Sequence, residues 1–165
     1  MRRLLGISGC VALTGLLLAL AAPAAAEESG QWHAKGVLVI LEKHTVKVED
    51  RANHTVTLVD WDGAVFNSDG KPFLDKARYQ GVSVTDMGVS SGGYKTFTDA
   101  DGSKVFATYR RTEANPPELR GTFEFIGGTG KYAGITGSGT YYLVFISDKA
   151  AWDELSGEYR IPTRP

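Results

Sequence analysis

Two polar side chains in the middle of the chain combine chemically useful groups with positions on an apolar face. In the run Lys104–Thr112, Tyr109 and Arg111 alternate in step with Val105 and Ala107, which is the period-two pattern of a half-buried strand. A phenol and a guanidinium on that face would stand among apolar side chains, where a charge or a hydrogen bond acts more strongly than in water. We therefore expect Tyr109 and Arg111 to line an interior cavity.

The next strand pattern supplies the expected apolar wall of that cavity. Phe123 and Phe125 alternate with Thr122 and Glu124, so the two rings share one face and are predicted to line the same cavity. Arg120 and Glu124 fall on the opposite face, where cross-strand ion pairing on the outside of the fold is favoured over a catalytic role. No residue is therefore assigned a catalytic role.

The three histidines do not have the spacing of a metal site. His33, His44 and His54 are eleven and ten residues apart, whereas metal-binding motifs place two histidines a few residues apart. Two of them could meet beside an aspartate on neighbouring strands, but solvated or hydrogen-bonded histidines are favoured. We predict neither a metal nor a cofactor.

Glycines are concentrated in one segment, with seven of the chain's 20 between Gly121 and Tyr142. A glycine loop can bind phosphate, but a Walker-type loop continues with Lys-Ser or Lys-Thr into a helix. Here Lys131 is followed by Tyr132 and the chain returns to a strand pattern. A tight corner of a β-barrel needs glycine for positive φ angles and for close approach of the backbone. We assign this structural role to Gly127, Gly128, Gly130 and Gly134.

The same segment carries a resemblance to a known family. Gly127–Gly134, with the sequence GGTGKYAG and followed by Gly137 and a strand pattern, resembles the GGTG-aromatic-x-G segment of the allene oxide cyclase and dirigent-like β-barrels. The hairpin signal Asp99–Gly102 and its spacing to this segment are similar to the bacterial secreted members, and the similarity covers about Asp99–Phe145.

The resemblance implies an eight-stranded antiparallel barrel with a mostly apolar cavity. It also implies a protein that is often trimeric and that acts on or holds small hydrophobic molecules. No stretch matches the catalytic residues of the plant enzymes, so the resemblance transfers no catalytic role.

The N-terminal stretch has the features of a secretory signal peptide. Two arginines precede the apolar run Val11–Ala22, and Pro23–Ala26 offers an A-x-A cleavage site. The run is shorter than the roughly 20 apolar residues of a transmembrane helix, so no stable membrane insertion is expected after cleavage. Lipidation at Cys10 is disfavoured because its lipobox-like context precedes the apolar run. We predict a signal peptide over residues 1–26 and a secreted or periplasmic protein.

Residues 27–165 have the size of one domain with its own core. Without the signal peptide the 18 basic residues fall to 16, against 19 acidic ones, for a net charge of −3. This balance argues against a nucleic-acid partner, which normally requires a basic surface. The only cysteine, Cys10, leaves with the signal peptide, so packing without a disulfide must stabilise the domain.

Short apolar runs separated by turn signals, with almost no amphipathic helix, are typical of an all-β sandwich or barrel. The glycine corner and the family resemblance favour the barrel. We predict an all-β fold, an eight-stranded antiparallel β-barrel of the allene oxide cyclase-like or dirigent-like type. Strand patterns cover residues 32–41, 43–49, 55–61, 78–86, 94–98, 104–112, 122–125, 138–146 and 156–161.

The connections are predicted from turn residues. Asp62-Gly63 is a turn signal, 67–77 is expected to be a loop, and Gly88–Gly93 is expected to turn or flex. Asn115–Pro117 should interrupt strand pairing because proline cannot donate a hydrogen bond to the ladder. Lys149–Leu155 is expected to form one helical turn.

Three functions are compatible with this barrel. The leading hypothesis is a secreted or periplasmic barrel that binds a small hydrophobic molecule in its interior. The alternative is a cyclase or dirigent-type enzyme that uses the same cavity to shape a reactive hydrophobic substrate. A structural barrel with a filled interior is a further alternative.

Two apolar runs also predict an assembly. The runs Val37–Leu41 and Tyr141–Ile146 are apolar at every position. In a barrel strand, however, one of the two faces points to solvent. The resulting apolar surface would be covered either by Lys149–Leu155 or by another subunit. We favour a homo-oligomer, and the family resemblance suggests a homotrimer.

Overall fold

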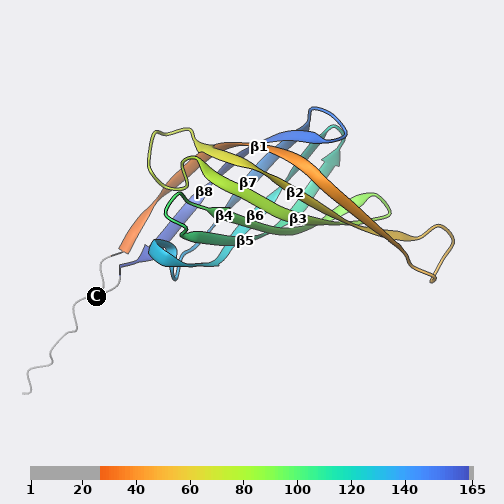
Figure 1. The fold of residues 1–165 in the computed structure, drawn as a ribbon, viewed down its shortest axis with the longest axis horizontal. Helices are drawn as coiled ribbons and strands as arrows, with labels where there is room; N and C mark the ends of the chain where they lie inside the picture. Colours follow the sequence, from red (N-terminus) through yellow and green to blue (C-terminus); the bar gives the residue numbers. More distant parts are fainter. Residues whose placement is uncertain (1–26, 164–165) are drawn as a thin grey trace, which may run out of the picture.

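Eight strands follow one another around a closed antiparallel barrel, and the last strand pairs with the first (Figure 1). This is a computed structural model, which describes residues 27–163. The strands are β1 (Glu27–Lys47), β2 (Thr55–Asn67), β3 (Ala77–Asp86), β4 (Val89–Thr98), β5 (Lys104–Asn115), β6 (Glu118–Gly128), β7 (Thr136–Phe145) and β8 (Ala150–Pro162), with a short 3-10 helix η1 (Gly130–Tyr132) before β7. The predicted all-β, eight-stranded antiparallel barrel is confirmed.

The alternation of inward and outward residues follows the sequence pattern. In β6, Leu119, Phe123 and Phe125 are buried, whereas Arg120 and Glu124 are exposed on the outside. The period of two therefore decides which face of a strand meets the barrel interior, as expected for a half-buried strand.

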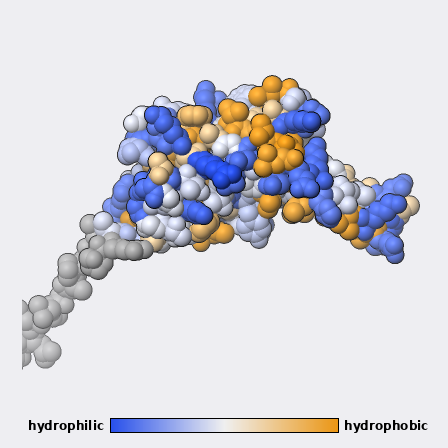
Figure 2. Space-filling view, viewed as in Figure 1, coloured by the Kyte–Doolittle hydropathy of each residue, from blue (hydrophilic) through white to orange (hydrophobic). Residues whose placement is uncertain are grey.

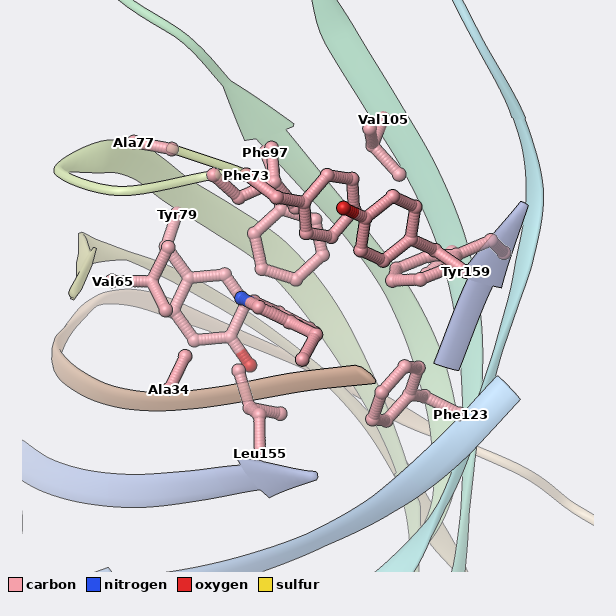
Figure 3. Close-up of a cluster of buried hydrophobic side chains, with 14 of the residues drawn as sticks. Ala34, Val65, Phe73, Ala77, Tyr79, Phe97, Val105, Phe123, Leu155 and Tyr159 are labelled. Carbon is pink, nitrogen blue, oxygen red and sulfur yellow. The ribbon is translucent and has the colours of Figure 1, made fainter. Parts of the chain in front are cut away.

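One half of the barrel interior is filled by aromatic side chains (Figure 3). The Trp32 ring lies edge-on to Phe73 and Phe97, at centroid distances of 5.6 and 5.5 Å. Phe73 stacks on Tyr159 at 3.7 Å. Phe73 belongs to the predicted loop 67–77. Phe73 and the neighbouring Leu74 are both buried, so this loop folds inward and closes this end of the barrel. This packed cluster supplies much of the core.

The glycine-rich connection between β6 and β7 forms the predicted corner. Gly127, Gly130 and Gly134 have φ angles of 148°, 59° and 81°, a region that other residues rarely adopt. Gly128 has a different requirement, because a Cβ there would lie 2.5 Å from the carbonyl oxygen of Tyr132. The corner is tied to the β4–β5 hairpin, where the Tyr132 hydroxyl donates to Asp99 over 2.6 Å.

Three predicted connections are wrong. Asp62-Gly63 lies inside β2, and most of Gly88–Gly93 lies inside β4. Lys149–Leu155 is not a helical turn, since from Ala150 onward it belongs to β8 and pairs with both β1 and β7. Pairing partners on both sides override the local turn signals. The predicted strands 32–41 and 43–49 are one strand, β1, with a register shift between Ile40 and Glu42.

An apolar strip remains exposed on the outer face of β1 and at the β7–β8 turn. Val37, Val39 and Leu41 are 51, 45 and 58% exposed, and Ile146 is 64% exposed. The register places the outward face of β1 beside that of β8, with Val37 opposite Trp152. Figure 2 shows apolar side chains gathered on one face among hydrophilic ones. Because 150–155 is part of the barrel wall, it does not cover this strip, contrary to the first of the two options considered above.

None of the helices in residues 27–163 has the length and apolar character needed to cross a membrane. The predicted signal peptide, residues 1–26, lies outside the described residues, as does Cys10.

Candidate functional site

The second half of the barrel interior encloses an open cavity of about 790 Å³. Its lining includes residues from the connections at the end opposite the Phe73 plug, namely Gly88, Pro116, Pro117, Ser147 and Asp148. The mouth of the cavity is therefore framed by the β3–β4, β5–β6 and β7–β8 turns. Apolar side chains such as Leu38, Ile40, Val59, Leu143 and Phe145 form much of the wall.

A buried charge pair lies in the deepest part of the barrel wall around the cavity. Lys95 of β4 and Asp153 of β8 are 4 and 0% exposed, and Lys95 Nζ lies 3.7 Å from Asp153 Oδ2. The hydroxyl of Tyr79 from β3 donates to the same carboxylate oxygen over 2.8 Å. Burial raises the pKa of Asp153 and lowers the pKa of Lys95 to about 8, and each group opposes the shift of the other. Each group is thus easier to neutralise than it would be in water.

Three tyrosine rings surround the Lys95 ammonium. Its nitrogen lies 5.2, 5.0 and 4.6 Å from the ring centroids of Tyr79, Tyr109 and Tyr141. Ring faces attract a cation, so this cage offsets part of the cost of removing the ammonium from water. The cage also places three phenols around the inner part of the cavity.

The phenols are hydrogen-bond donors at neutral pH. Tyr109 and Ser83 share a hydrogen bond of 2.5 Å between their hydroxyl oxygens. Burial raises the pKa of Tyr109, and it raises the pKa of Tyr141 to about 12. Both hydroxyls therefore remain protonated, and they can donate to an oxygen of a bound molecule.

The predicted cavity residues separate into two pairs. Tyr109 and Arg111 line the cavity. Phe123 and Phe125 point into the barrel but are only 3% exposed and pack against Trp32 in the filled half, so they do not belong to the cavity lining. Alternation along a strand identifies the inward face, but it does not say at which depth of the barrel an inward side chain lies.

Sequence reasoning missed Lys95, Asp153 and Tyr79. A signal was present for two of them, because Lys95 is two residues from Phe97 and Asp153 lies between Ala151 and Leu155 on the inward face. A charged residue at an inward position of an alternating strand is costly unless it is paired, which makes it a candidate for a functional or structural ion pair.

The histidines lie outside the cavity. His54 is nearly buried between Asp50 and Asp86, with Nδ1 hydrogen-bonded to the first and Nε2 2.9 Å from the second. His33 Nδ1 lies 2.9 Å from the Ser156 hydroxyl, and His44 is exposed. Within residues 27–163, no group of three or more His, Cys, Asp or Glu side chains is arranged to hold a metal ion.

Comparison with solved structures shows the same fold in dirigent proteins. The chain is similar to the pterocarpan synthase dirigent protein GePTS1, with a TM-score of 0.54 and 16% sequence identity over 84% of this chain and 88% of that chain. It is also similar to the pterocarpan synthase dirigent protein PsPTS1, with a TM-score of 0.47 and 16% identity over 84% of this chain and 97% of that one. No protein-family model matches the chain, and no curated protein matches it. The dirigent-like barrel expected from the glycine segment is confirmed as the fold.

Proposed function

We propose that this protein is a secreted or periplasmic barrel that binds one small, mainly apolar molecule in its open half. The observation that carries the proposal is the cavity of about 790 Å³ between the aromatic cage and the turns at its mouth. Ligand sites in proteins typically have volumes of about 300–1,000 Å³, with apolar walls and a few polar groups that fix orientation. Here Tyr109, Tyr141 and Ser83 supply such polar groups.

The contrast between the two halves of the interior supports binding over a purely structural role. One half is packed with rings in direct contact, so the fold can fill its interior with side chains. In the other half, Leu143 and Phe145 line an open space. A barrel with a filled interior, the structural alternative, requires no such space.

A dirigent-type or cyclase-type enzyme is the second candidate, and the Lys95–Asp153 pair favours it. A fixed ion pair in a dry site can stabilise charge that develops in a reacting molecule, and the Tyr79 hydroxyl holds the carboxylate in place. Such an enzyme would act chiefly by holding a reactive substrate in one shape. Both functions require the same cavity.

A neutral fluorescent probe tests the proposal. We expect N-phenyl-1-naphthylamine to bind at one site per chain and to raise the melting temperature, because a ligand that binds only the folded state stabilises it. Leu143→Trp, which places a larger side chain at a cavity-lining position, should weaken binding. Thr140→Trp, on the exposed face of the same strand, should leave binding unchanged.

The proposal fails if the probe does not bind, or if both tryptophan variants bind it as the parent protein does. Turnover can be tested separately, since binding without conversion of a reactive hydrophobic substrate would leave the enzyme alternative without support.

A further inference from the structure

Arg111 has no acceptor for part of its guanidinium group. Its side chain comes from β5, immediately before a register shift between Arg111 and Glu113, and it lines the cavity. Its Nε is buried and makes no hydrogen bond to the described part of the chain. A buried donor without a partner is unfavourable, and in native proteins such a group usually meets a water, an ion or a ligand. The bulge after Arg111 is also a typical means of directing a side chain at a site.

The other charges around the cavity do not neutralise Arg111. Lys95 is paired with Asp153 in the inner part. Lys43 and Asp148 are exposed at the mouth, where water solvates them. Among residues 27–163, no carboxylate lies within 4.0 Å of the Arg111 guanidinium in an ion pair. The cavity therefore contains a cation at middle depth without a protein counter-ion.

Two phenols, those of Tyr109 and Tyr141, line the cavity together with Arg111. Burial raises the pKa of Tyr141 and of Tyr109, and the Arg111 charge opposes both shifts, which places it close to the two phenols. The guanidinium and the two hydroxyls present several N–H and O–H donors to one region of the cavity, and none of the three groups carries a negative charge. Carboxylates and related oxyanions match this set, because a planar guanidinium binds them through two parallel hydrogen bonds.

We propose that the molecule bound in this cavity is an organic anion, with an apolar body and one acidic oxygen group that pairs with Arg111. This inference rests on the proposed binding function and specifies its ligand class. In this proposal, apolar side chains of the cavity wall, such as Leu38 and Phe145, contact the apolar body of the molecule, and Arg111 binds its acidic group. The pair would satisfy the Nε donor and supply the missing counter-ion.

Two probes with the same ring skeleton test the proposal. 1-Anilinonaphthalene-8-sulfonate carries an anionic group that neutral N-phenyl-1-naphthylamine lacks. We expect the parent protein to bind the sulfonate at least about tenfold more tightly, the factor typical of one charge-assisted contact in a site shielded from water. Arg111→Met, which keeps a long side chain but removes the charge, should abolish this preference and leave the affinity for the neutral probe within about twofold.

Lys43→Met is the matched control, because it removes a cation from the exposed mouth. It should preserve the preference for the sulfonate. Circular dichroism and the melting temperature of each variant show whether it is folded before affinities are compared. The affinities of the parent protein and of a variant for the two probes form a thermodynamic cycle. A change in the cavity that affects both probes equally therefore cancels from the preference for the sulfonate.

Three results would overturn the inference. In the first, the parent protein binds both probes equally, which leaves the proposed binding function intact and removes the anion. In the second, Arg111→Met keeps the preference, or Lys95→Met or Lys43→Met removes it instead. In the third, Leu143→Trp weakens neither probe, which shows that the probes bind outside the cavity and refutes the proposed function itself.

Discussion

The Lys95–Asp153 pair allows a quantitative test of how the barrel interior is stabilised. Replacing Lys95 by Met keeps most of the apolar stem and removes the ammonium from its cage of three tyrosines. Asp153, which is 0% exposed, then keeps the hydrogen bond from Tyr79 but loses its counter-ion. An uncompensated buried charge destabilises a protein strongly, by about 3–5 kcal/mol.

The expected loss is near the lower limit, about 3 kcal/mol, because Asp153 can take up a proton once its partner is gone. Burial already raises the pKa of this carboxyl, so protonation removes part of the penalty. For a domain of this size the unfolding entropy is about 2.1 cal/mol/K per residue, and a loss of about 3 kcal/mol corresponds to a fall in melting temperature of roughly 10 °C.

The assay is urea unfolding of the parent protein, of Lys95→Met, of Asp153→Asn and of the double variant, all without added ligand. Asp153→Asn keeps an acceptor for the Tyr79 hydroxyl, so it tests the charge alone. We expect the double variant to lose less stability than the two single variants together, by about 1 kcal/mol or more. Additive losses, or a loss below about 0.5 kcal/mol for Lys95→Met, would refute the view that these two charges stabilise each other.

Three further predictions concern other parts of the barrel. Gly130→Val, at a φ of 59°, and Gly128→Val, against the Tyr132 carbonyl, should each lower the free energy of unfolding by about 2 kcal/mol or more. Thr129→Val, between them, should cost less than about 1 kcal/mol. Equal losses at the three positions would refute the structural role assigned to these glycines. The hydrogen bond that His54 donates to the Asp50 carboxylate raises the pKa of His54. The stability that His54 adds over His54→Gln should therefore be present below pH 6.5 and lost as the pH rises through the folded-state pKa, and a difference independent of pH would contradict this. Because the strip with Val39 and Ile146 is exposed, we propose a homo-oligomer and expect a trimer. Light scattering should give a mass above that of one chain, and Ile146→Lys should reduce this mass without loss of the β-sheet circular dichroism. A monomer mass at all concentrations would exclude the homo-oligomer.

The sequence predicted the elements that depend on local pattern. Alternation placed Tyr109 and Arg111 on the inward face and Arg120 and Glu124 on the outward face. The glycine segment predicted the corner because positive φ angles restrict residue choice at Gly127, Gly130 and Gly134. These features require information from a few neighbouring residues only.

The depth of a side chain in the barrel requires the stagger of all eight strands, which no single strand pattern contains. Phe123 lies in the packed half for this reason, although Tyr109 opposite it on β5 lines the cavity. Lys95 and Asp153 come from β4 and β8, far apart in sequence, so their pairing appears only once the barrel closes. The burial of Phe73 was likewise not predicted, because the connection between β2 and β3 shows no periodic pattern of apolar residues.

In the open half, two large rings pack directly against inward-facing glycines. A Cβ on Gly81 would lie 2.3 Å from the Trp61 ring, and a Cβ on Gly121 would lie 2.4 Å from the Tyr141 ring. Those rings therefore occupy space next to the backbone that a side chain of β3 or β6 would otherwise fill. In the packed half, by contrast, the Trp32 and Phe73 rings contact each other edge to face.

This arrangement makes the cavity dependent on glycine at positions that face inward. Gly121→Ala would force the Tyr141 ring away from β6 and toward the cavity, where it would also disturb the cage around Lys95. A Cβ at this position would lie 2.1 Å from the Arg110 carbonyl oxygen, so β5 and β6 would have to separate slightly as well. The volume left for a ligand is thus set by the smallest residues of the barrel as much as by the aromatic residues that line it.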